Sequence, residues 1–170
     1  GSYSVVNQKD EDGVYRSVPG FKYIIDLDKV SGKWQYGVTR MVESNTYQVN
    51  DLGFLQAANE VSHAGYFRYN LLKPYELFNR FNSSVSFFHE RLYKPGEFSR
   101  FNMSMNSYAQ FRNFWGLGVN YSINPVTGYD YFEPRNEGYY FSLAPSKSYS
   151  MSIESDGRKP LKGNIYTGRS

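Results

Sequence analysis

The sequence contains no cysteine, which excludes disulfide bonds and thiolate metal sites. It also has no window of about 18 consecutive apolar residues, so a membrane-spanning helix is excluded. The net charge of +3 is small, and the lysine and arginine residues are spread along the chain rather than gathered into a patch. A nucleic-acid partner is therefore not predicted.

Aliphatic residues are sparse as well, and the mean hydropathy is -0.62. Aromatic residues, in contrast, make up 19% of the chain, with 17 Tyr and 13 Phe. A soluble β-sandwich fills its core mainly with Val, Ile and Leu, whereas a membrane-spanning barrel places Tyr, Phe and Trp at its two interfaces with water. The composition therefore favours a barrel in a membrane.

Apolar residues alternate with small or polar residues along most of the chain. Because successive side chains of a strand point to opposite faces, this pattern predicts sheets with one apolar and one polar face. In an outer-membrane barrel the apolar face contacts lipid and the polar face lines the lumen. The residues predicted to face lipid are Trp34, Tyr36, Val38, Trp115, Leu117, Val119 and Tyr121, and those predicted to face inward are Gln35, Thr39, Asn120 and Ser122.

Nine segments with this character follow one another, and helical periodicity is not convincing anywhere. They cover residues 2–8, 21–30, 33–42, 59–71, 78–92, 98–110, 114–124, 146–154 and 161–169. Short turns are expected near residues 31, 74, 112 and 157, an intermediate one near 95, and long connections over 9–20, 43–56 and 125–145. All long connections would then lie at one end of an antiparallel up-and-down meander, as in outer-membrane barrels.

Bacterial single-chain barrels have an even number of strands, and a ninth strand without a closing partner leaves an unpaired sheet edge, which a lipid environment does not tolerate. We therefore interpret residues 1–170 as one segment of a larger transmembrane β-barrel, incomplete at both ends. The expected partners are outer-membrane lipid or detergent, together with the remaining barrel strands or another envelope protein at the open edges.

Several short motifs occur in an order that resembles a known family: Gly20-Phe21-Lys22-Tyr23, Lys29-Val30-Ser31-Gly32-Lys33-Trp34, Asn50-Asp51-Leu52-Gly53-Phe54, Asn59-Glu60-Val61-Ser62-His63, Arg91-Leu92-Tyr93, Phe111-Arg112-Asn113-Phe114-Trp115 and Tyr129-Asp130-Tyr131-Phe132-Glu133. Over roughly residues 20–155 the chain resembles the barrel region of the Bacteroidota outer-membrane family known as domain of unknown function 5916. The resemblance implies an outer-membrane barrel whose biochemical activity is undefined. Relatives typically carry an amino-terminal domain similar to carbohydrate-binding module family 9, which has no counterpart in this sequence.

Candidate ligand-binding residues lie in the two connections richest in aromatic residues: Asp51, Asp130, Tyr131 and Glu133. Carboxylates beside aromatic rings can bind sugars or hold Ca2+ through oxygen ligands. Asp is also a common turn former in exposed loops, and this second interpretation accounts for the same residues. His63 and His89 lie in the middle of predicted strands without a metal-ligand spacing, so we interpret them as hydrogen-bonded residues of the lumen.

No catalytic residue, cofactor or metal ion is predicted, because the sequence has no nucleophile elbow and no phosphate-binding or dinucleotide-binding loop. The predicted function is that of an outer-membrane β-barrel protein of the bacterial envelope, acting as a pore wall, a surface platform or a subunit of an envelope assembly. The alternative is a soluble β-sandwich or small barrel that binds glycans through exposed aromatic loops. A degradative surface enzyme would require a carboxylate pair that the sequence does not identify.

Overall fold

The computed structural model describes residues 1–9, 13–47, 58–71, 73–134, 136 and 138–170. These residues form strands β1 (Ser2–Lys9), β2 (Tyr15–Lys29), β3 (Trp34–Glu43), β4 (Glu60–Leu71), β5 (Phe78–Leu92), β6 (Phe98–Phe111), β7 (Gly116–Asn124), β8 (Gly128–Asp130), β9 (Phe141–Leu143), β10 (Ser146–Glu154) and β11 (Asn164–Arg169). In this described part of the chain, no helix has the length and apolarity needed to cross a bilayer.

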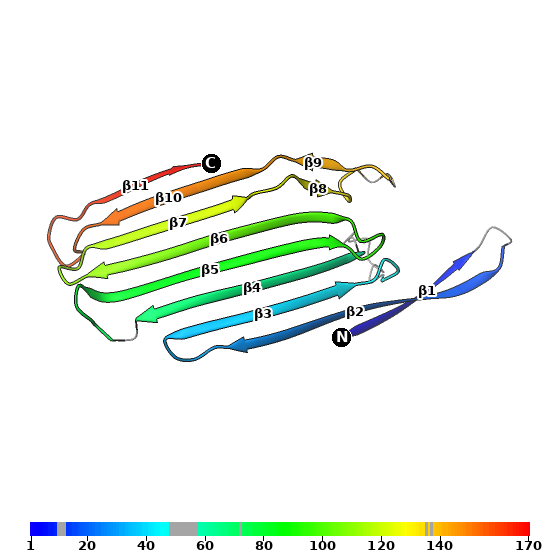
Figure 1. Ribbon diagram of the computed structural model, residues 1–170, viewed down its shortest axis with the longest axis horizontal. Coiled ribbons are helices and arrows are strands. Elements are labelled where there is room, and N and C mark those ends of the chain that lie inside the picture. The colour runs from blue at the N-terminus through cyan, green and yellow to red at the C-terminus, as the bar shows by residue number, and fades with distance from the viewer. Residues whose placement is uncertain (10–12, 48–57, 72, 135, 137) are drawn as a thin grey trace.

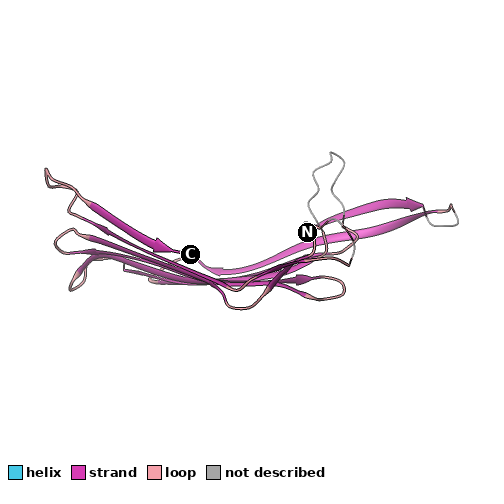
Figure 2. Cartoon of the chain, turned by 90° about the horizontal axis from the view of Figure 1, so that it is seen from above, coloured by secondary structure: helices cyan, strands magenta, loops and turns pink. Residues whose placement is uncertain are grey.

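Nine of the strands form one antiparallel sheet in the order β1-β2-β3-β4-β5-β6-β7-β10-β11, and β8 pairs separately with β9 (Figure 1). The predicted all-β meander of nine strands is therefore confirmed. The sheet is open, with β1 and β11 as its two edges. Seen from above, it is a single curved layer (Figure 2).

The second strand begins earlier than predicted, at Tyr15 instead of residue 21, because Pro19 and Gly20 do not interrupt it. Pro19 pairs with Val5 of β1, whereas β3 begins to pair with β2 only at Lys22. The missing amide hydrogen of Pro19 is thus tolerated, since no third strand requires it. The connection expected over residues 9–20 shrinks accordingly to residues 10–14.

One further expectation about the connections was wrong, and one expected connection contains strands that were not predicted. The turn near residue 157 is longer than expected, because Ser155 and Gly163 close it by hydrogen bonds from Ser155 N to Gly163 O (2.8 Å) and from Gly163 N to Ser155 Oγ (2.7 Å). The connection over residues 125–145 contains the small β8–β9 hairpin. Its Gly-Tyr-Asp and Phe-Ser-Leu strands are too short to show a periodic pattern in the sequence.

The register assigns the strand residues to two faces, since directly opposite residues of an antiparallel pair share a face. One row across the sheet runs through Trp34, Tyr69, Ser83, Ser107, Val119, Met151 and Thr167. We call this side the apolar face; it also carries Ile25, Leu27, Tyr36, Val38, Phe67, Val85, Phe87, Met103, Met105, Leu117, Tyr121, Tyr149 and Ile165. The opposite, polar face carries Gln35, Thr39, Ser84, Ser86, Asn102, Ser104, Asn120, Ser122, Ser148 and Ser150.

The sheet buries very little apolar surface. Among the described residues, the buried apolar side chains are Val42, Tyr47, Val61, Leu92 and Ala109. The chain exposes 12401 Å² in total, whereas a compact monomer of 19.7 kDa exposes about 8,600 Å². On the apolar face Trp34, Tyr36 and Val38 are each about half exposed, so this face needs a cover that the described residues do not provide.

We expect Gly20→Ala to destabilise the protein by about 1–3 kcal/mol, the usual cost of forcing an extra carbon into a packed site. An added Cβ at Gly20 would overlap the backbone of Thr46 and Tyr47, which packs directly on β2. Equilibrium unfolding in urea, followed by tryptophan fluorescence, measures the change. Gly163→Ala is the control, because a Cβ there meets no atom within 4 Å; an equal loss in both variants would contradict this account.

Candidate functional site

Connections of different length leave the two ends of the sheet. We call one end the loop end; it carries the connections 10–14, 44–59, 93–97 and 125–145. The other is the turn end, with the connections 30–33, 72–77, 112–115 and 155–163. The strands that flank the two longest connections, 44–59 and 125–145, meet them at the loop end, to the right in Figure 1. That end is therefore where candidate binding residues can gather.

Charged side chains line up on the polar face at the loop end. Glu43 forms an ion pair with Lys22 and lies opposite Glu60 on the next strand. Glu90 of β5 accepts hydrogen bonds from Arg100 Nη2 at 2.8 Å and Arg100 Nε at 3.1 Å. Glu43 and Glu90 are buried, and these partners offset the cost of removing a carboxylate from water. The sequence did not identify this charged row, because its members meet only through the register of β2 to β6.

The β8 segment lies over this charged row. The Ser99 hydroxyl is 3.0 Å from both Glu90 Oε1 and the carbonyl oxygen of Tyr129, so it bridges the sheet and β8. A pocket of about 210 Å³ lies between them, lined in part by Glu60, Glu90, Arg100 and Asp130. Glu90 is paired with Arg100 and Ser99, and Asp130 accepts hydrogen bonds from backbone N–H groups, so the contacts around this pocket hold β8 against the sheet.

Three of the predicted ligand-binding residues lie in one turn. Asp130 ends β8, and its Oδ1 accepts hydrogen bonds from the backbone N–H groups of Phe132 (2.9 Å) and Glu133 (3.1 Å). Glu133 is exposed. This is the geometry of an Asp that shapes a turn, the second interpretation offered by the sequence. Asp51 lies outside the described residues.

Tyr131 contributes to a cluster of tyrosine rings. Its ring centroid is 5.6 Å from that of Tyr140, and the Tyr129 and Tyr140 centroids are 5.2 Å apart. The Tyr131 hydroxyl donates a hydrogen bond to the carbonyl oxygen of Phe98 at 2.9 Å. Partial burial raises the pKa of this hydroxyl above its ordinary value, which favours its role as a donor.

Aromatic rings form a continuous row near the turn end, mainly on the apolar face. Trp34 contacts Tyr69 with ring centroids 4.4 Å apart, and the contacts continue from Tyr69 to Phe81 at 6.0 Å. Phe78 extends the row to Phe81 and Phe111, both at 5.5 Å. Trp115, also predicted to face lipid, lies in the turn just before β7 and is 45% exposed.

A second aromatic group lies near the loop end. The rings of Phe21 and Tyr93 meet edge to face at 5.8 Å, and His89 contacts Phe98 at 5.8 Å and Phe101 at 6.5 Å. Along β5, the distance from Phe81 to His89 is about 26 Å at 3.3 Å per residue, or about 20 Å along a barrel axis tilted by about 40°. That spacing is close to the apolar band of about 25 Å found in outer-membrane barrels.

The polar face is hollowed between β6 and β11. The hollow has a volume of about 500 Å³, and its lining includes Ser104, Asn106, Asn120 and Ser148. Side chains on this face bond across strands: Asn120 Nδ2 donates to Ser150 Oγ at 3.1 Å, and the hydroxyls of Ser86 and Ser104 are 2.7 Å apart.

His63 and His89 lie on the apolar face, contrary to the prediction that they line the lumen. They are directly opposite each other in the register, with ring centroids 6.0 Å apart. Within the described residues, no group of three or more His, Cys, Asp or Glu side chains is arranged to hold a metal ion.

A sequence profile for the family described as Domain of unknown function (DUF5916) matches residues 1–169. The chain belongs to this family. The predicted resemblance is thus confirmed and extends beyond residues 20–155. No curated protein and no solved structure matches the chain.

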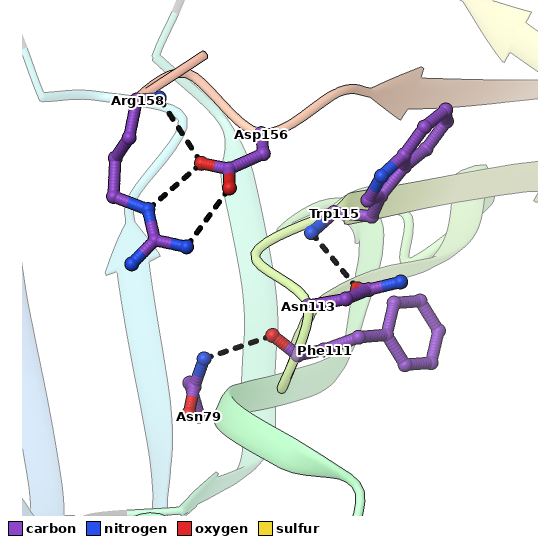
Figure 3. A network of polar contacts seen from close by, with 6 residues as sticks. All are labelled: Asn79, Phe111, Asn113, Trp115, Asp156 and Arg158. Carbon is purple, nitrogen blue, oxygen red and sulfur yellow. Dashed lines mark hydrogen bonds and ion pairs between the residues drawn. The ribbon is translucent and has the colours of Figure 1, made fainter.

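In this DUF5916 region, the Phe111-Arg112-Asn113-Phe114-Trp115 motif holds the turn end together (Figure 3). Asn79 Nδ2 donates to the carbonyl oxygen of Phe111 at 2.9 Å, and Asn113 Oδ1 accepts from Trp115 N at 3.1 Å. The Arg158 guanidinium lies 3.1 Å from the centre of the Phe114 ring and is held by Asp156. The motif therefore joins the start of β5 on one side to the connection 155–163 on the other.

Comparing the variants Asp130→Ala and Asp130→Asn tests whether Asp130 shapes the turn or binds a ligand. We expect faster hydrogen exchange at the amides of Phe132 and Glu133 in Asp130→Ala, because two hydrogen bonds to Oδ1 are lost. Asp130→Asn keeps an acceptor oxygen and should leave exchange nearly unchanged. Calcium or glycan binding that disappears in Asp130→Asn while the turn stays protected would restore the ligand role.

The ion pair in the connection 155–163 predicts a pH dependence. Hydrogen bonds from Arg158 hold the pKa of Asp156 at about 2, below its ordinary 3.8. Because this pKa is lowered by folding, the pair stabilises the turn above pH 3.8 and loses its effect as the pH falls through about 2. A carboxyl carbon NMR titration measures it: Arg158→Gln should return the Asp156 pKa toward 3.8, and Lys159→Gln should change it less. Equal shifts in the two variants would refute the assignment.

Proposed function

We propose that this DUF5916 region forms part of the wall of an antiparallel β-barrel in a bacterial outer membrane. The apolar face contacts lipid and the polar face turns toward the lumen. The observation that carries the proposal is the apolar face itself, which continues over the strands of the sheet and leaves large apolar side chains exposed, a pattern that soluble monomers rarely show.

Polar groups on the two faces support this orientation. On the apolar face, Ser83 and Ser107 satisfy each other by a hydrogen bond of 2.7 Å, as hydroxyl groups in a dry environment must. The polar face, in contrast, carries the Ser and Asn ladder and the hollow of about 500 Å³. The two aromatic groups, one near each end of the strands, fit the positions of interfacial girdles.

The open edges define what the region needs from its surroundings. Among the described residues, β1 and β11 each pair with a neighbouring strand on one side, so their outer edges offer backbone donors and acceptors to a further strand. Lipid cannot satisfy those groups, which calls for further strands of the same barrel or for another envelope protein. The work of this region is passive, as a pore wall, a surface platform or a subunit of an envelope assembly.

Single-cysteine spin labelling tests the orientation, since the chain has no cysteine of its own. Labels at Val38 and Val85 on the apolar face are compared with labels at Thr39 and Ser84, their neighbours on the polar face. In bilayers we expect the first pair to collide mainly with oxygen and the second pair mainly with a water-soluble nickel chelate. Exposed Asn45 serves as the water-accessible control.

Two outcomes would overturn the proposal. If all four strand positions are accessible to the nickel chelate, the apolar face is not in lipid. If the protein is monodisperse without detergent and the Val38 and Val85 labels are shielded from both reagents, the soluble glycan-binding alternative is favoured.

A further inference from the structure

Charges are divided unequally between the two faces of the sheet. Among the described strand residues of the nine-stranded sheet, all Asp and Glu lie on the polar face: Asp26, Asp28, Glu43, Glu60, Glu90 and Glu154. The apolar face carries basic residues instead: Lys29, Arg40, His63, His89, Arg91, Lys147 and Arg169. An apolar surface with basic groups and no acidic ones is a specific electrostatic feature.

The basic residues also gather at one end. Lys29 is the exception, because it lies near the turn end. Its Nζ donates hydrogen bonds to the carbonyl oxygens of Ser31 and Trp34, both at 2.7 Å. The others lie toward the loop end of their strands. The positive charge of the apolar face is therefore concentrated at the loop end.

Four of these residues form what we call the basic cluster: Arg40, His63, His89 and Arg91. Arg40 lies opposite His63, and His63 opposite His89, on three consecutive strands. Arg91 follows two residues after His89 on the same strand and therefore lies on the same face. Both arginines are exposed, and neither has a carboxylate partner among the described residues.

The surroundings of the basic cluster indicate what it can bind. His89 contacts the loop-end rings of Phe98 and Phe101. The adjacent row toward the turn end contains Val38, Phe87 and Met103 around Gly65, an apolar strip suited to an acyl chain. A lipid can place its phosphate against the cations and its acyl chains along the apolar strip. A free phosphate ion can contact only the cations.

We infer that Arg40, His63, His89 and Arg91 bind the phosphate group of an anionic lipid headgroup, with the acyl chains along Val38, Phe87 and Met103. This inference rests on the proposed function, because it requires the apolar face to lie in lipid.

The test uses the intact protein in detergent micelles, titrated with dioleoylphosphatidic acid and followed by native mass spectrometry. Dioleoylphosphatidylcholine is the headgroup control. Arg40→Gln combined with Arg91→Gln should weaken phosphatidic acid binding about 30-fold, since each surface arginine contributes about fivefold to anionic lipid binding. Arg68→Gln combined with Arg80→Gln makes the same charge change on the polar face and should leave binding unchanged.

Three results would overturn the inference: no preference for phosphatidic acid in the unmodified protein, an equal loss in both double variants, or full displacement of the lipid by inorganic phosphate. The spin-label experiment separates its failure from that of the proposed function. If the labels at Val38 and Val85 contact lipid but the protein shows no headgroup preference, only the inference about the basic cluster is refuted. If those labels contact water, both this inference and the proposed function are refuted.

Discussion

Backbone hydrogen bonds between neighbouring strands hold this protein together, because side-chain burial contributes so little. Apart from β8 against β6, extensive contacts between elements occur only between strands paired in a sheet. A single layer of this kind has no interior, so its apolar side chains must be covered from outside. The arrangement of residues on the two faces, the aromatic groups and the division of charge all follow from that constraint.

The alternation of side chains turns a local sequence pattern into a property of the whole sheet. The register determines which residues of neighbouring strands share a face. Through it, Trp34, Val85 and Met151 lie on the same face although they are far apart in sequence. A slip of one residue in any strand would bring polar groups to the apolar face. The cross-strand pairs, such as Ser83 with Ser107 and Ser86 with Ser104, fit only one register on each face.

The strands could be predicted from the sequence because a period of two is a local signal. The predicted start of the second strand was wrong, because proline was expected to interrupt it. Pro19 lies where β2 pairs with β1 alone, so its missing N–H does not disturb the sheet. The face of His63 and His89 was predicted wrongly, although alternation within their own strands places His63 with Phe67 and His89 with Val85. The sequence did not reveal that Glu43, Glu60 and Glu90 converge on one end of the polar face, because that depends on the register, which the connections between the strands set.

The charges on the two faces act on each other through the sheet. Glu90 on the polar face lies between His89 and Arg91 in sequence, which point to the apolar face. Opposite charges on the two sides of one strand attract each other, and this attraction weakens with their separation and with the effective dielectric constant between them. The charged row of the polar face and the basic cluster of the apolar face therefore favour each other's position at the loop end. Under the proposed membrane orientation, both would lie where the lipid-covered part of the strands ends.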